Sequence, residues 1–252
     1  MIARLHHHKT GERDLHIYVP PSYEQSRQQR YPVVYVHDQG ELVMGCFNTL
    51  EHLFLSRQLP ELIFVGIGTE NRIDDYTPWP AEALMESAPS FGGKGRDYLQ
   101  ELTEQIKPEI DARYRTLVER EHTALLGCSL GGLISVYAAY EYADRFGNIG
   151  AISASFWYEG MLDFIQTRSL PPLQPKLYSY VGLLEGVYKT NLQKNMVPNT
   201  MAVHEHWKKQ GWAKERLKLE VHPQGTHDHH FFIQQFLSAL HWFFGGRETV
   251  IA

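Results

Sequence analysis

The sequence predicts an α/β fold with a mostly parallel central sheet and helices on both faces. Two observations support this prediction. Short, nearly all-apolar runs of β-branched and aromatic residues alternate with segments of helical periodicity along the chain. Neither a repeat nor a long linker interrupts that alternation. Strands that alternate with helices are typical of a parallel sheet covered on both sides. We therefore expect a single domain over residues 1–252.

The expected strands are apolar runs bounded by turn-forming residues. Runs such as "YPVVYVHD" lack a polar face, which suits a strand buried on both sides. In chain order the expected strands lie within "DLHIYVP", "YPVVYVHD", "ELIFVGIGTE", "TALLGCS", "GNIGAISAS", "PKLYSYVGLLE" and "RLKLEVHPQG".

The expected helices lie between these strands. Their apolar residues recur at helical spacing, and the segments cover residues 47–58, 96–114, 132–142, 199–210 and 231–244. The Pro-rich stretch at 170–175 is interpreted as a connection within the domain.

Composition excludes several classes of function. The formal net charge is −5, so no basic excess favours binding to nucleic acid or to an anionic membrane. The chain has no run of about 20 apolar residues, and its N-terminus lacks a secretory signal, so we expect a soluble cytoplasmic protein. Two cysteines, Cys46 and Cys128, do not form a disulfide framework.

The segment "LLGCSLGGL" contains the pattern G-x-S-x-G, with Ser129 at its centre. Alone the pattern is weak, because a Gly-rich turn without chemistry can produce it. Here it lies between an expected strand and an expected helix, which is the context of a nucleophile elbow. In such an elbow the serine has an unfavourable backbone conformation, and bulkier residues at Gly127 or Gly131 would collide with nearby backbone. We therefore predict that Ser129 is a nucleophile.

A serine nucleophile needs a base, and His227 is the preferred candidate. It lies in "PQGTHDHHFF", in the expected loop between the last strand and the last helix. His229 and His230 remain alternatives in the same loop, whereas His204 and His206 are expected on a helix surface. The "HDHH" cluster also suggests a metal site, but its spacing is too tight and no cysteine is nearby. We expect neither a metal nor a cofactor.

The third group of a triad is a carboxylate that orients the histidine. In this architecture the order along the chain is Ser, then Asp or Glu, then His. Glu185 follows the expected strand "KLYSYVG" and is preferred. Asp163 is the main competitor, although no strand directly precedes it, and Asp228 is too close to His227 to turn back to it.

The oxyanion hole requires two backbone N–H groups. The first is expected from Leu130, directly after the nucleophile. The second is expected from the turn "HDQG" after an earlier strand, where Gln39 is the first choice and Gly40 the second.

Several longer segments resemble the esterase D-like family of α/β-hydrolases. The matching segments are "YPVVYVHDQG", "IFVGIGTENRIDDYTP", "FGGKGRDYLQELTEQIKPEIDARYRT", "LLGCSLGGL" and "ISASFWY". Siderophore esterases, feruloyl esterases and S-formylglutathione hydrolases belong to that family. The resemblance implies an α/β-hydrolase fold, with the family's nucleophile at Ser129, its histidine at His227 and its acid at Glu185.

These residues predict a serine esterase that works through an acyl-enzyme intermediate on a small-molecule ester. The ester itself stays open, with a siderophore lactone or an aryl ester as candidates. An acyltransferase with the same triad and a non-catalytic binding protein are alternative interpretations. Arg72, Tyr76 and Trp157 are candidates for substrate binding. Core or loop packing would explain the two aromatic residues equally well, and an arginine beside Asp74 and Asp75 is more often paired locally than used for a substrate.

Overall fold

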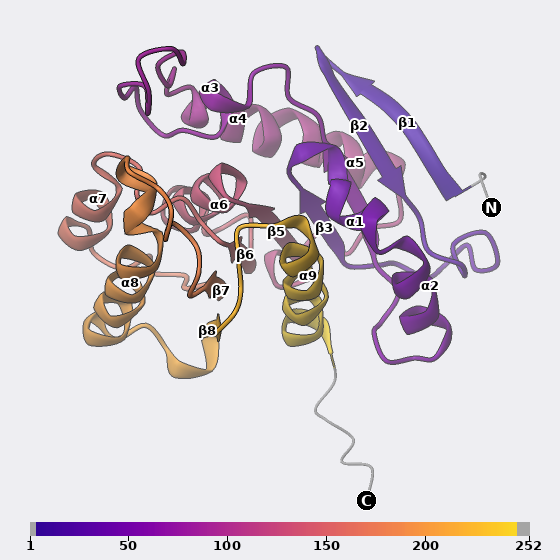
Figure 1. The fold of residues 1–252 in the computed structure, drawn as a ribbon. Helices are drawn as coiled ribbons and strands as arrows, with labels where there is room; N and C mark the ends of the chain where they lie inside the picture. Colours follow the sequence, from indigo (N-terminus) through magenta and orange to yellow (C-terminus); the bar gives the residue numbers. More distant parts are fainter. Residues whose placement is uncertain (1–3, 246–252) are drawn as a thin grey trace, which may run out of the picture.

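In the computed structural model, which describes residues 4–245, eight strands form one sheet (Figure 1). Their order across the sheet is β1-β2-β4-β3-β5-β6-β7-β8. The bounds are β1 Leu5–Thr10, β2 Arg13–Tyr18, β3 Val33–Val36, β4 Ile63–Ile67, β5 Thr123–Cys128, β6 Asn148–Ile152, β7 Lys176–Gly182 and β8 Leu217–His222. All seven expected strands are present.

The sheet is parallel from β4 through β3 to β8, and β1 and β2 are antiparallel to their neighbours. β1 was not expected, because its sequence "LHHHKT" is polar. It lies at the edge of the sheet and pairs only with β2, so its side chains need not be apolar.

Helices cover both faces, as the alternation of patterns predicts. All five expected helices form, and the segment 96–114 is a helix with a π-helical turn at 102–106. The short helices α1, α3 and α7 were not predicted, because they span at most seven residues. The bounds are α1 Glu41–Gly45, α2 Phe47–Leu55, α3 Arg72–Asp75, α4 Gly95–Glu101, α5 Lys107–Arg113, α6 Leu130–Glu141, α7 Met161–Thr167, α8 Met196–Gln210 and α9 His229–Phe244.

The sheet separates two apolar cores. Alternate residues of β3 point to opposite faces of the sheet. Val33 and Tyr35 pack into one core, and Val34 and Val36 pack into the other. The first core lies under α4 to α8, and the second under α1, α2 and α9. Figure 1 shows this division, with α7 and α8 to one side of the strands and α9 to the other. A strand buried on both faces explains the all-apolar runs.

His204 on α8 corrects an expectation. It was expected on the surface but is only 5% exposed. Thr200 and Trp207, four residues before and three residues after it, are also buried, so the three side chains share the inward face of the helix. Burial lowers the pKa of His204 to about 4. The helical period alone could have revealed its position.

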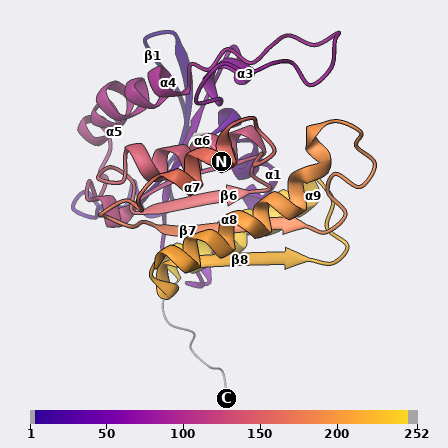
Figure 2. The same ribbon diagram turned by 90° about the vertical axis from the view of Figure 1, so that its left-hand side faces the viewer.

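The carboxyl ends of the parallel strands meet at one edge of the sheet. Figure 2 shows the arrows of β6, β7 and β8 pointing the same way, with the segment between β7 and α8 projecting beyond them. Open α/β sheets place their binding sites at this edge. The segments after β3, β5, β7 and β8 carry the predicted residues of the triad and the oxyanion hole, and those after β4 and β6 carry Arg72, Tyr76 and Trp157.

Replacing Phe236 by alanine should lower the free energy of unfolding by about 3–5 kcal/mol. Phe236 on α9 is fully buried against Phe64 of β4, with ring centroids 6.0 Å apart, so the change leaves a cavity in the second core. Urea unfolding followed by circular dichroism measures the loss. The control is Leu55→Ala, because Leu55 is 72% exposed and should lose less than about 1 kcal/mol. Equal losses in the two variants would contradict the assignment of α9 to the core.

Candidate active site

Ser129 lies on a strained turn between β5 and α6. Its backbone angles, φ 57° and ψ −120°, lie outside the regions that non-glycine residues prefer. Its N–H donates to the carbonyl of Ile152 on β6 at 3.0 Å, which helps to hold this conformation. The unfavourable backbone expected for a nucleophile elbow is therefore present.

Two glycines allow the elbow to form. A Cβ on Gly127 would lie 2.7 Å from the carbonyl carbon of Gly131, so a side chain there would collide with backbone. A Cβ on Gly131 would lie 3.2 Å from the Cβ of His37, which is a tight contact with a side chain. The expected backbone collision thus holds for Gly127, whereas Gly131 is restricted by His37.

His37 fills the space beneath the elbow. Its ring is buried, with Nδ1 2.7 Å from Tyr98 Oη and Nε2 3.1 Å from Ser135 Oγ. Ser135 donates its own proton to the carbonyl of Gly131, so its oxygen accepts from His37 Nε2. His37 Nδ1 then accepts from Tyr98, which makes the imidazole neutral. Burial, with a smaller contribution from Arg72, lowers the pKa of His37 to about 3.

His227 and Glu185 are in contact. His227 Nδ1 donates to Glu185 Oε2 at 2.7 Å. The carboxylate is buried, and its Oε1 accepts from Ser153 Oγ at 2.7 Å and from the N–H of Gly182 at 2.8 Å. Hydrogen bonds to both oxygens compensate for the loss of water around the buried charge.

Ser153 was missed by the sequence analysis. It follows β6 and has a positive φ of 46°, which turns its hydroxyl toward Glu185. The one local signal was its place in "ISASFWY" directly after a strand. Its partner is 32 residues away, so only the packing of β6 beside β7 reveals the contact.

Within the described residues, 4–245, no hydrogen bond joins Ser129 to His227. Ser129 Oγ is instead 3.3 Å from Ser155 Oγ. The ring of His227 packs edge-on against Phe232, with centroids 5.0 Å apart. Because Glu185 occupies Nδ1, the nitrogen left for Ser129 is Nε2. Catalytic hydrogen bonds are often loose without substrate and tighten when it binds.

The competing residues have other environments. His229 is the first residue of α9 and borders the same cavity as Ser129. His230 is exposed, with Nε2 2.9 Å from Gln234 Nε2. Asp163 is an exposed residue of α7, whereas Glu185 contacts His227.

The turn after β3 lies next to the elbow, since a Cβ on Gly131 would be 3.5 Å from Asp38 Oδ2. Asp38, Gln39 and Gly40 all have positive φ values, of 54°, 56° and 77°. The N–H of Asp38 donates to Tyr76 Oη at 2.9 Å, and that of Gly40 to the carbonyl of His37 at 3.2 Å. Among these three, the N–H of Gln39 is the one not used within the turn. Leu130 begins α6, so its N–H has no acceptor in the helix.

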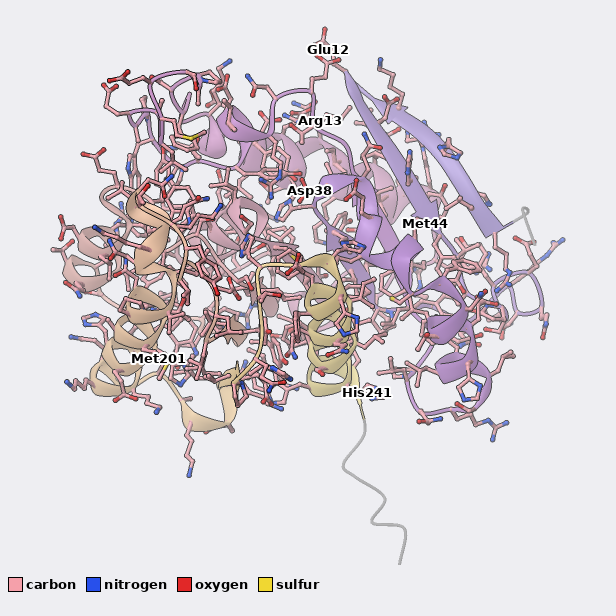
Figure 3. The ribbon with its side chains drawn as sticks, in the orientation of Figure 1. Glu12, Arg13, Asp38, Met44, Met201 and His241 are labelled. Carbon is pink, nitrogen blue, oxygen red and sulfur yellow. The ribbon has the colours of Figure 1, made fainter. Side chains whose placement is uncertain are left out.

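Arg72 joins this turn to the elbow. Its Nε donates to Asp38 Oδ1 at 2.7 Å, and its Nη2 donates to the carbonyl of Cys128 at 3.2 Å. Asp38 lies beside α1 near the middle of the molecule (Figure 3). Pairing of Arg72 with an acidic neighbour was expected at Asp74 or Asp75, and the actual partner is Asp38, 34 residues away.

Two expected pocket residues belong to the core. Tyr76 is fully buried, and its hydroxyl is used by the N–H of Asp38. Trp157 is 6% exposed and packs against Phe91 and Tyr158. Both rings face inward because the segments that carry them fold back over the first core. Of the three candidates, Arg72 borders a cavity of about 330 Å³ together with Ser129.

No group of three or more His, Cys, Asp or Glu side chains within residues 4–245 is arranged to hold a metal ion. In the same part of the chain, none of the helices has the length and apolar character needed to cross a membrane. Both cysteines are buried and unpaired.

Comparison with known proteins places this architecture among esterases. A family model described as "Putative esterase" matches residues 8–243. The chain is 38% identical over 251 residues to "Uncharacterized protein YbbA" of Bacillus subtilis strain 168, and the match covers all of both chains.

Solved structures with the same fold have lower sequence identity. An IroE-like serine hydrolase from Shewanella oneidensis has a TM-score of 0.82 and 21% identity, over 95% of this chain and 80% of the other. The siderophore hydrolase EstA from Aspergillus nidulans has a TM-score of 0.76 and 18% identity, over 94% of this chain and 93% of the other. The fold is therefore that of the α/β-hydrolases, as expected.

The buried His37 should make stability depend on pH. Its folded pKa of about 3 is below that of an unfolded histidine, about 6.5, so unfolding takes up a proton between these values. The contribution of neutral His37 to the free energy of unfolding is therefore fully present above pH 6.5, and it decreases as the pH is lowered. Between pH 6.5 and pH 5 the contribution lost is about 2 kcal/mol. Urea unfolding at several pH values should show that His37→Gln lacks this part of the slope. Parallel curves for the two proteins would contradict the neutral, buried state of His37.

Proposed function

This chain belongs to the "Putative esterase" family and is a carboxylic ester hydrolase, and we propose that it uses a Ser129–His227–Glu185 triad through an acyl-enzyme intermediate. The observation that carries the triad is the 2.7 Å hydrogen bond between His227 and Glu185 at the same sheet edge as the strained Ser129. A buried carboxylate fixed on the far nitrogen of a histidine is what a serine nucleophile requires of its base.

In the first step Ser129 Oγ attacks the ester carbonyl. His227 Nε2 takes the hydroxyl proton as the bond forms. Glu185 holds Nδ1–H, which fixes the tautomer and stabilises the imidazolium ion. For this step Ser129 Oγ must exchange its weak hydrogen bond of 3.3 Å with Ser155 Oγ for one with His227 Nε2.

Negative charge develops on the former carbonyl oxygen. The N–H groups of Leu130 and Gln39 stabilise it, and the N-terminus of α6 adds the positive end of its dipole. Gln39 is preferred to Gly40 because the N–H of Gly40 already donates to His37. Gly66 supports this arrangement, since a Cβ there would lie 2.2 Å from the carbonyl oxygen of Gln39.

The alcohol leaves with the proton from His227, and water then cleaves the acyl-enzyme by the same route. His227 acts as a base toward water and as an acid toward Ser129. Arg72 positions the oxyanion hole through its contacts with Asp38 and Cys128, and it does not take part in proton transfer.

For the substrate we propose a siderophore lactone or an aryl ester. The siderophore hydrolase EstA and the enterobactin esterase of Shigella flexneri share the fold and support the first. The chain spans 57% of the length of the enterobactin esterase. Assays of a catecholate siderophore lactone beside short-chain nitrophenyl esters separate the two candidates.

Ser129→Ala should lower kcat/KM for ester hydrolysis by a factor on the order of 10⁴ or more, because the nucleophile is lost. Nitrophenyl acetate turnover measures this, and circular dichroism checks that the fold is intact. Ser238→Ala is the control, since Ser238 lies on the exposed face of α9, where its hydroxyl donates to the carbonyl of Gln234, and it does not border the cavity that contains Ser129. A folded Ser129→Ala protein with near-normal turnover would show that another residue is the nucleophile.

His227→Ala should be nearly as damaging as Ser129→Ala, because a triad acts as a unit. His229→Ala and His230→Ala should each lower kcat/KM by less than about tenfold, since neither contacts the carboxylate of Glu185. If either of them loses more activity than His227→Ala, then the base has been assigned to the wrong histidine.

The same turnover assay tests Glu185 when Glu185→Gln and His227→Ala are combined in one double variant. Glu185→Gln alone should lower kcat by roughly 10³–10⁴, since the amide can favour the wrong tautomer of His227. Once His227 is alanine, Glu185→Gln should cost little more. Additive losses would contradict an action of Glu185 through His227.

A further inference from the structure

The loop between β7 and α8 exposes an unusual number of apolar side chains. Of twelve large hydrophobic residues that are exposed within residues 4–245, five lie at positions 183–192. They are Leu183, Leu184, Val187, Tyr188 and Leu192, with exposed fractions from 42% to 95%. Exposed apolar side chains gathered in one place are typical of a binding surface.

The backbone of this loop is fixed, so the exposure is not the result of a loose chain. Leu183 and Leu184 donate their N–H groups to the carbonyls of His222 and Gly225, each at 3.0 Å. Gly186 has a φ of 77° and packs so closely that a Cβ would lie 2.4 Å from the carbonyl oxygen of Gln193. The backbone that carries these side chains is therefore held in place before any ligand binds, which lowers the entropic cost of binding.

The loop forms one wall of a cavity of about 340 Å³, and His227 also lines this cavity. Leu184, Val187, Tyr188 and Met196 supply its apolar surface, and Glu185 and His227 border it from the side of the triad. Ser129 borders a different cavity, where Asp38, Glu41 and Arg72 are charged. The two sides of the site thus differ in polarity.

The chemistry of the triad assigns a part of the substrate to each side. The acyl group stays on Ser129 and beside the oxyanion hole. The alcohol must leave from the side of His227, because this residue donates the proton to the departing oxygen. A group attached to that oxygen extends past His227, where the apolar cavity lies.

We propose that this cavity is the subsite for the alcohol portion of the ester, and that it accepts an apolar alkyl or aryl group. This inference rests on the proposed triad and defines the substrate class further. It favours esters of apolar alcohols over lactones whose leaving oxygen carries polar groups.

The first test compares acetate esters that share one acyl group. Methyl and hexyl acetate have alcohols of similar intrinsic reactivity, so their difference in kcat/KM measures the binding of the alkyl chain. The unmodified protein should prefer hexyl acetate by about tenfold or more, the least that a hydrophobic pocket gives for a single added methylene. Val187→Ser and Leu184→Ser should each reduce that preference about threefold or more.

Matched controls exist elsewhere on the surface. Val118 is 49% exposed against 57% for Val187, and Leu173 is 48% exposed against 45% for Leu184. Neither control residue borders the cavity. Val118→Ser and Leu173→Ser should keep the hexyl-to-methyl ratio of the unmodified protein. If the ratio of kcat/KM for hexyl acetate to that for methyl acetate falls in the controls as well, the assignment of the subsite to this loop is overturned.

A second test does not need turnover. Saturation-transfer NMR should detect 1-hexanol bound to the unmodified protein, with a weaker signal for Val187→Ser. If both acetates are hydrolysed equally well, the subsite is wrong although the triad stands. If no ester is hydrolysed, the triad fails, and the hexanol experiment still decides the subsite: absence of binding overturns it. A dimer in analytical ultracentrifugation that Val187→Ser dissociates would also overturn it, because a second copy would then cover the loop.

Discussion

The close approach of the turn after β3 to the elbow after β5 is the constraint on which the site depends. β3 and β5 are hydrogen-bonded neighbours, so their carboxyl ends lie side by side. His37, directly after β3, packs against both elbow glycines, and a side chain at Gly127 would collide with it as well as with Gly131. Because His37 is neutral and hydrogen-bonded on both nitrogens, it fills this space without an unpaired polar group.

Backbone strain is concentrated at this edge of the sheet. Within residues 4–245, five non-glycine residues have positive φ values, and four of them are Asp38, Gln39, Ser129 and Ser153. Such conformations cost on the order of 1–3 kcal/mol each and persist only where the surroundings hold them. Here three of these four residues donate their backbone N–H groups to fixed acceptors. Asp38 donates to the hydroxyl of Tyr76, Ser129 to the carbonyl of Ile152, and Ser153 to the carbonyl of Tyr180. The rigid sheet therefore supports the strain that aims these groups.

Charge is arranged to match the proposed chemistry. Glu185 is buried but accepts three hydrogen bonds, one of them from His227, so neither of its oxygens lacks a partner. Asp38 is paired with Arg72, which keeps its negative charge from opposing the developing oxyanion. On the other side of His227 the cavity is mainly apolar, with Lys189 as a charged residue among its lining, so the proposed leaving group there is recognised mostly by its shape and its hydrophobic surface.

The sequence alone determined the seven strands from β2 to β8, the five longer helical segments, the elbow at Ser129 and the loop positions of Glu185 and His227. These features are local: periodicity sets the elements, and glycines mark the turns that only they can form. Tertiary structure decided the rest. The pairs Arg72–Asp38 and Ser153–Glu185 join residues more than thirty positions apart, and the inward rotation of Tyr76 and Trp157 follows from how their loops cover the core. Side chains distant in sequence meet only where the crossovers of a parallel sheet bring strand ends together, and no local pattern encodes that meeting.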